Sequence, residues 1–272
     1  MKYLNLWNNV KIKLKPQPLT NNSKIIMNGL EAVVSISLVI MIGTFSRVYL
    51  YLRNDALDPN EAAVVISAIN KIFHSFFTSP LEFYQIVPLG FMFCLKICVN
   101  LFGYSEYILR LYPFLCGIAS LFIFLLLLRV YVKPGIIWFA LLFFASSVNQ
   151  IELTSRILQR STDVPIALIA YLVVTFIWFK NLSSLKLIIF YLFTIVLIWM
   201  AFPVFFIFAG FSACTLLFSF INKNYNRSSK VTYFTICWIL SAICYYYLYL
   251  HFLMPQRFNG FIWKEGGNSL FI

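Results

Sequence analysis

Long apolar segments alternate with short polar ones along the chain, and this pattern predicts a bundle of membrane-spanning helices. A helix needs about 20 mainly apolar residues to cross a bilayer, and the run Ala32–Tyr51 is the first to meet that length. The later segments that we expect to span are Leu109–Leu128, Gly135–Ser147, Val164–Phe179, Leu187–Met200, Val204–Ile221 and Val231–Leu250. The prediction is an all-α polytopic membrane protein with about seven spans.

An amphipathic segment follows the first span. Between Ala62 and Phe77, apolar residues recur with the period of a helix, while the opposite stripe is polar and consists of Ser67, Asn70, Lys71 and His74. The segment is too polar to span, so we expect one helix that lies flat at the membrane interface.

The segment Leu81–Gly103 is apolar enough to span but contains Lys96, whose burial at mid-bilayer costs about 2.5–3.5 kcal/mol. If it does not cross, the basic loops after the later spans fall on the same side as the Lys-rich N-terminal arm. Loops rich in Lys and Arg are cytoplasmic in membrane proteins. We therefore expect a second juxtamembrane or re-entrant helix, with the N-terminus cytoplasmic and most acidic residues outside.

These assignments divide the chain into a cytoplasmic arm (1–28), a transmembrane domain (29–250) and an outer C-terminal stretch (251–272) at which we expect the chain to be truncated. Two polar loops face outwards in this topology. The first polar loop covers about residues 52–108, and the second polar loop covers about residues 148–163.

Composition supports a membrane protein and argues against several other classes. The chain is 61% hydrophobic and 11% charged, whereas soluble domains are about 25% charged. Its formal net charge of +12 follows the positive-inside distribution, so we do not expect nucleic acid as a partner. The six cysteines lie in apolar runs without a C-x-x-C pair, which favours packing over metal binding or disulfides.

The first polar loop offers candidate chemistry at Asp58–Glu61. Asp58 before Pro59, with Glu61 three positions after it, is the pattern of a capping box that starts a helix. The same carboxylates could serve a reaction, and a helix N-terminus also favours phosphate. Further along, Glu106 and Arg110 are four residues apart, which predicts a pair on a helix surface.

The rest of this loop contains a longer series of motifs. It reads Ser79-Pro-Leu-Glu-Phe-Tyr-Gln-Ile-Val-Pro88, and then Leu101-Phe-Gly-Tyr-Ser-Glu106-Tyr-Ile-Leu-Arg110-Leu-Tyr-Pro113. Together with Leu-Asp-Pro-Asn-Glu-Ala, the series resembles the membrane glycosyltransferases of the GT-C superfamily, in the branch with protein mannosyltransferases, aminoarabinose transferases and bacterial envelope-sugar transferases. The resemblance covers about residues 55–165 and continues only in hydropathy.

The resemblance implies a GT-C-like helical bundle in the bacterial inner membrane, with juxtamembrane helices in the first polar loop. The activity would be transfer of a sugar from a polyprenyl-phosphate donor to a lipid, glycan or protein acceptor outside the cytoplasm, and some relatives use a divalent cation. A carboxylate would act as general base. The implied catalytic positions are Asp58, Asn60 and Glu61, and the implied donor-phosphate and substrate positions are Gln85, Lys96, Glu152, Arg156, Arg160 and Asp163.

Three alternatives remain open from the residues alone. Asn60 and Arg156 stand where the family usually has acidic residues, which favours a non-catalytic or truncated relative that binds a lipid or a partner. Lys96 fits snorkelling to the headgroups, and Arg156 and Arg160 fit anchors at the interface. A transporter or channel is less favoured, because the spans after Arg110 carry essentially no charge.

Overall fold

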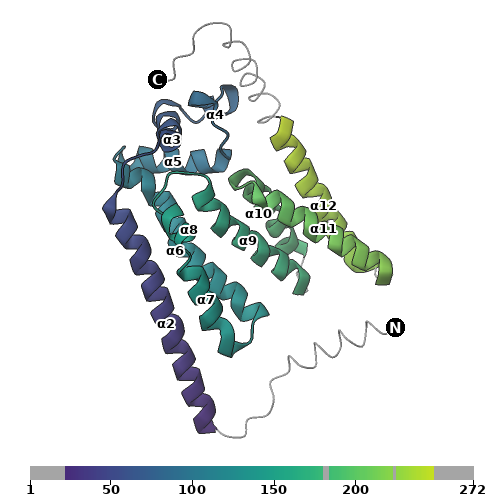
Figure 1. The fold of residues 1–272 in the computed structure, drawn as a ribbon. Coiled ribbons are helices and arrows are strands. Elements are labelled where there is room, and N and C mark those ends of the chain that lie inside the picture. The colour runs from purple at the N-terminus through teal and green to yellow at the C-terminus, as the bar shows by residue number, and fades with distance from the viewer. Residues whose placement is uncertain (1–21, 180–183, 223–224, 248–272) are drawn as a thin grey trace, which may run out of the picture.

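The computed structural model describes residues 22–179, 184–222 and 225–247, which form helices joined by short loops and include no strand (Figure 1). The long helices lie side by side, and the short helices α3, α4 and α5 gather at one end of them (Figure 1). The elements are α2 (Asn22–Arg53), α3 (Pro59–Asn70), α4 (Ser75–Thr78), η1 (Glu82–Tyr84), α5 (Leu89–Phe102), α6 (Glu106–Tyr131), η2 (Pro134–Ile136), α7 (Ile137–Ala145), α8 (Val148–Leu153), α9 (Arg160–Phe179), α10 (Ser184–Met200), α11 (Pro203–Asn222) and α12 (Tyr225–Tyr245).

Three of the described helices are long and apolar enough to cross a membrane by length and composition, namely Glu31–Arg53, Glu106–Tyr131 and Arg160–Ile177. Shorter apolar helices form the rest of the bundle. The prediction of a helical membrane protein is therefore confirmed, and the count of seven spans stays a prediction.

The ends of the chain differ from the predicted division or lie outside the described residues. Helix α2 begins at Asn22, so the last residues of the predicted arm 1–28 are helical. Residues 1–21 and the predicted outer stretch 251–272 are outside the described part of the chain.

Arg47 connects α2 to the end of α7. Its side chain is fully buried, and Nη1 donates hydrogen bonds to the carbonyl oxygens of Gly43, at 2.9 Å, and Ala145, at 3.3 Å. The last carbonyls of a helix lack partners within the helix and attract a cation. Arg47 therefore stabilises the point at which α7 stops and the chain turns into α8. Apolar residues of α2, α6 and α7, including Leu121 and Leu141, pack around this junction.

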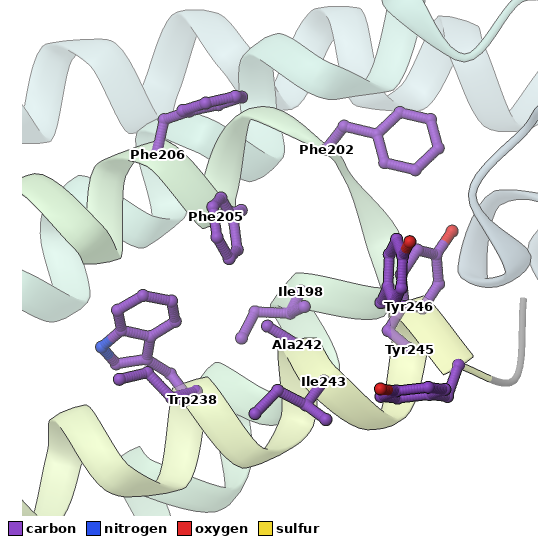
Figure 2. A pocket seen from close by; sticks show the side chains of 11 residues that line it. Ile198, Phe202, Phe205, Phe206, Trp238, Ala242, Ile243, Tyr245 and Tyr246 are labelled. Carbon is purple, nitrogen blue, oxygen red and sulfur yellow. The ribbon is translucent and has the colours of Figure 1, made fainter. Parts of the chain in front are cut away.

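The second half of the bundle, α9–α12, packs around a second apolar cluster that includes Phe208 and Phe234. On one side it leaves an apolar groove of about 550 Å³ between α10, α11 and α12. Figure 2 shows Phe205 and Trp238 at one end of the groove and Tyr245 with Tyr246 at the other. Trp238 and Tyr245 are about 10 Å apart along the helix axis at the usual rise per residue.

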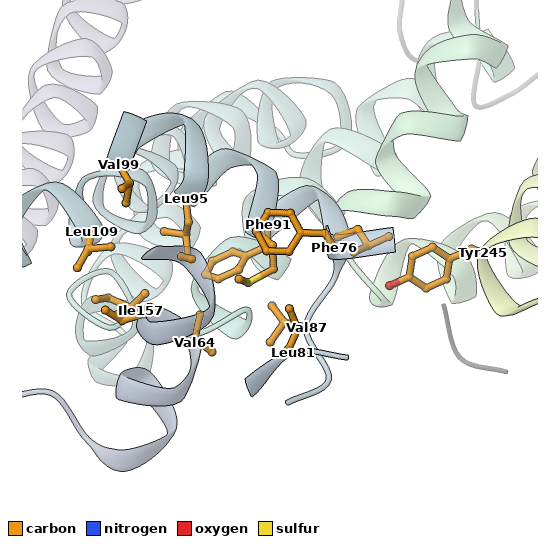
Figure 3. Packing of buried hydrophobic residues seen from close by; sticks show 14 residues of the cluster. Val64, Phe76, Leu81, Val87, Phe91, Leu95, Val99, Leu109, Ile157 and Tyr245 are labelled. Carbon is orange, nitrogen blue, oxygen red and sulfur yellow. The ribbon is translucent and has the colours of Figure 1, made fainter. Parts of the chain in front are cut away.

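The first polar loop has a core of its own. Buried residues of α3, α4 and α5, among them Val64, Phe76, Phe91 and Leu95, pack together with Ile157 of the second polar loop (Figure 3). Tyr245 belongs to the same cluster, so the apolar groove reaches this core at one end. The two polar loops and the end of α12 are thus joined by one continuous apolar contact.

The predicted amphipathic helix between residues 62 and 77 is wrong in two respects. First, α3 ends at Asn70, because Lys71 is extended, and a separate turn of helix, α4, begins at Ser75. This break lets Phe76 enter the core. Second, the polar stripe is not all exposed: Ser67 is fully buried and its hydroxyl accepts a hydrogen bond from the Glu82 N–H at 2.9 Å. Helix α3 therefore packs against the later segments of the first polar loop.

Candidate functional site

The N-terminus of α3 has the capping box that the sequence predicts. Asp58 Oδ1 accepts a hydrogen bond from the Glu61 N–H at 2.8 Å, and Glu61 Oε2 accepts one from the Asp58 N–H at 3.0 Å. Pro59 occupies the first helical position, where a missing N–H costs nothing. Local sequence therefore sets the geometry of both carboxylates.

Glu61 is almost completely buried, with 2% of its surface exposed. Its second carboxylate oxygen, Oε1, accepts a hydrogen bond at 2.7 Å from the backbone N–H of Ile157 in the second polar loop. Both oxygens of Glu61 thus have backbone donors. Hydrogen bonds to N–H groups offset the cost of burying the carboxylate, so Glu61 joins the two polar loops.

Asp58 is the accessible carboxylate of the two. Its Oδ2 lies 3.3 Å from Nη1 of Arg156, and the two side chains are 32% and 46% exposed. The contact brings the first and second polar loops together at their polar surface, and its two residues are close in sequence to Glu61 and Ile157, which form the buried bond. An ion pair this exposed contributes about 0–1 kcal/mol to stability, so it is not needed to hold the fold together.

Two further arginines lie near this ion pair. Arg53, at the end of α2, forms an exposed ion pair with Asp55. The hydrogen bond from Arg53 holds the pKa of the Asp55 carboxyl below its ordinary value, and the charges of Arg53, Arg110 and Arg156 act in the same direction. Three guanidinium groups therefore act on one short segment of the first polar loop. Arg53 and Arg156 are the exposed members of this group, each beside a carboxylate, and guanidinium groups bind phosphate oxygens well.

The other predicted site residues are spread more widely. Asn60 is exposed in the first turn of α3, beside the ion pair in sequence, and Arg160 is exposed at the start of α9. Glu152 is exposed at the end of α8, and Gln85 is half-buried after η1. Asp163 is half-buried in the first turn of α9, and its Oδ1 has no hydrogen-bond partner among the described residues.

Lys96 is not part of this cluster. Its side chain is buried, and Nζ donates a hydrogen bond at 2.9 Å to the carbonyl oxygen of Ile69. Ile69 is near the C-terminal end of α3, so it lies about 15 Å along the helix from the Asp58 cap. Lys96 therefore neither snorkels to the surface nor reaches the ion pair, and instead satisfies the end of a helix.

The predicted surface pair between Glu106 and Arg110 is wrong. Glu106 accepts a hydrogen bond from the side chain of Asn54 at 2.9 Å, whereas Arg110 is buried and donates to backbone carbonyls. A signal for this burial was present, because Arg110 is on the same helix face as the small residues Pro113 and Gly117. A stripe of small residues predicts close approach of another segment.

The described residues contain no group of three or more His, Cys, Asp or Glu side chains that could hold a metal ion. No protein-family model, curated protein or solved structure matches this chain.

Proposed function

We propose that this protein is a membrane glycosyltransferase that moves a sugar from a polyprenyl-phosphate donor to an acceptor at the outer face of the membrane. The observation that carries the proposal is the contact between Asp58 and Arg156. It joins an accessible carboxylate and an accessible guanidinium, from two polar loops, at one end of an apolar helical bundle. The GT-C-like resemblance of the first polar loop supports the same activity.

Each member of the contact has a role suited to this reaction. The Asp58 carboxylate would accept the proton of the attacking acceptor hydroxyl, as a general base does. The Arg156 guanidinium would bind the donor phosphate and stabilise the negative charge that grows on it as the bond to the sugar breaks. Glu61 is less suited to proton transfer, since both of its oxygens already accept backbone hydrogen bonds.

The apolar groove suits the lipid part of such a donor. It is lined by aromatic side chains such as Phe205, Trp238 and Tyr246, and one end adjoins the core of the first polar loop through Tyr245. An isoprenoid chain is apolar and flexible, so it gains from burial along a surface of this kind. Under the proposal, the tail occupies the groove and the phosphate lies at the polar loops.

A binding assay and a transfer assay together test the proposal. Purified protein is mixed with a polyprenyl phosphate and, as a control, with the matching polyprenol, which lacks the phosphate. We expect the phosphate form to bind more tightly and Arg156→Gln to remove most of that difference. Arg129→Gln is the matched control, because it also removes an exposed arginine, in the last turn of α6, that is not among the predicted site residues. Equal binding of both lipids to the unaltered protein would contradict the proposal.

Transfer is then measured with a set of polyprenyl-phosphate sugars carrying a labelled sugar. Asp58→Asn should abolish transfer and leave binding intact, since Asn is also a good N-cap residue and preserves the start of α3. Unchanged transfer by this variant would remove Asp58 from the mechanism.

A second candidate is a non-catalytic protein that binds the same lipid phosphate. Two observations favour it. Asn60 stands where the resembled motif has an acidic residue, and the carboxylate of Asp58 is already paired with the guanidinium of Arg156. Binding of polyprenyl phosphate without transfer of any sugar in the set would select this candidate.

A further inference from the structure

In the segment Thr154–Ile157 of the second polar loop, Arg156 is exposed and the other three residues are buried. Thr154, Ser155 and Ile157 are 3%, 7% and 0% exposed, whereas the side chain of Arg156 is 46% exposed. An arginine on a surface loop is usually free to move and loses considerable entropy when it binds. Here the residues on both sides of Arg156 are fixed.

Three contacts fix this segment, two from α6 and one from α3. A Cβ atom on Gly117 of α6 would lie 1.9 Å from Thr154 Cγ2, so the loop touches the helix backbone there. The Ile157 N–H donates to Glu61 of α3. Between them, the Ser155 carbonyl oxygen accepts a hydrogen bond from Nη1 of Arg110.

Arg110 is the unusual member of this set. It is 1% exposed, and no described carboxylate contacts it; Nη1 donates to the Ser155 carbonyl and Nη2 donates to the Asp55 carbonyl at 2.5 Å. Burying a guanidinium without a carboxylate is costly unless its hydrogen bonds are well used. Two of its three nitrogens donate to backbone carbonyls of the two polar loops, and Nε has no hydrogen-bond partner among the described residues.

We propose that Arg110 is a positioning residue that ties Asp55 of the first polar loop to Ser155 of the second and thereby fixes Arg156 opposite Asp58. The tie is a property of the fold. Only the use of Arg156 for an anionic phosphate rests on the proposed function. A guanidinium held in place binds phosphate at a lower entropic cost.

A crosslinking measurement in membrane vesicles tests the positioning directly. Cysteines replace Asp58 and Arg156, and a short bifunctional thiol reagent joins them; the protein without these two cysteines gives the background from the six native ones. The crosslinked peptide is quantified by mass spectrometry. The double-cysteine variant lacks the ion pair between Asp58 and Arg156, so its crosslinking yield reports how well the backbone holds the two loops together.

In this background we expect Arg110→Gln to lower the crosslinking rate about tenfold, which corresponds to losing one charge-assisted hydrogen bond. Arg53→Gln is the matched control, because Arg53 is an arginine of the same region that bonds only to the exposed Asp55 side chain in the described structure. Its rate should stay unchanged. Equal rates for the two variants would overturn the inference.

Two further variants separate positioning from general damage. Arg110→Lys keeps the charge but cannot reach both carbonyls, so its crosslinking rate should fall between those of Arg110→Gln and Arg53→Gln. A rate equal to that of the unaltered background would also overturn the inference.

Arg110→Ala leaves a cavity that free guanidinium ion can fill. Added guanidinium should restore crosslinking in this variant and sodium should not, whereas no restoration in a protein that is still folded would contradict the tie. No sugar transfer is measured, so failure here is distinct from failure of the proposed function.

Discussion

The carboxylate of Glu61 accepts a hydrogen bond from the Ile157 N–H at 2.7 Å, across 96 positions of sequence. The same side chain caps its own helix, so one buried group supports both polar loops. The two acidic residues of the capping box, Asp58 and Glu61, therefore differ in burial and in the groups they contact. Both oxygens of Glu61 are buried against backbone N–H groups, whereas Asp58 caps the helix with Oδ1 and has a partly exposed Oδ2 that contacts Arg156.

Glu61→Gln should therefore destabilise the protein. A glutamine amide offers one acceptor oxygen, so one of the two backbone N–H groups would face an N–H₂ group instead. We expect the free energy of unfolding to fall by about 1–3 kcal/mol, measured by thermal unfolding in detergent. Asn60→Gln is the control, because Asn60 is exposed in the same turn of helix. Equal stability of the two variants would contradict the role given to Glu61.

Arg156→Gln, in contrast, should have little effect on stability. Its ion pair is half-exposed, so the free energy of unfolding should change by less than about 1 kcal/mol. Thermal unfolding of the purified variant checks this expectation. A loss as large as that of Glu61→Gln would mean that Arg156 is a structural residue, and its assignment to ligand binding would fail.

Gly117→Ala tests the contact between α6 and the second polar loop. The added methyl group would overlap Thr154 Cγ2, so the loop must shift, at a cost of about 1–3 kcal/mol. Gly210→Ala in α11 is the matched control: outside its own stretch of helix, no heavy atom of the described residues lies within 4 Å of the added methyl group, and alanine favours a helix. The unfolding temperature of the Gly210→Ala control should equal or exceed that of the unaltered protein, and that of Gly117→Ala should be lower.

Ala242→Trp tests the apolar groove. Ala242 lies on its wall (Figure 2), so a large ring there should exclude a lipid chain. We expect the affinity for polyprenyl phosphate to fall about tenfold, equivalent to the lost burial of about two methylene groups. Ala119→Trp, on an exposed part of α6, should leave the affinity unchanged. Equal affinities in a binding titration would place the lipid elsewhere.

Labelling of single cysteines tests the topology. Asn60 and Lys133 are both exposed, at opposite sides of the predicted membrane. A membrane-impermeant maleimide added to intact cells should react with Asn60→Cys and should reach Lys133→Cys only after permeabilisation. The reverse pattern would invert the predicted orientation.

The sequence predicted those features that depend on near neighbours. The capping box at Asp58 is an example, because its hydrogen bonds join residues three positions apart. The bundle was also predicted, since apolar length is a local property. The break at Lys71 was missed, because burial of Phe76 against a distant segment overrides the helical period.

The candidate site was predicted as a set of residues but not as an arrangement. The pair Asp58 and Arg156 joins positions 98 apart, and no periodicity within either loop indicates that contact. Arg110 was missed for the same reason: the spacing to Glu106 suggested a local pair, whereas its partners are 45 and 55 positions away. The small residues Pro113 and Gly117 on the same helix face indicate that another segment approaches there, but they do not identify that segment.

The contact between Arg47 and the end of α7 has a consequence for biosynthesis. A lone arginine in a membrane span costs about 2.5–3.5 kcal/mol, and its partner Ala145 is made 98 residues later. Until α7 has been made, Arg47 has only the Gly43 carbonyl of its own helix as a partner. The buried position of this arginine is therefore completed by a helix that is synthesised later.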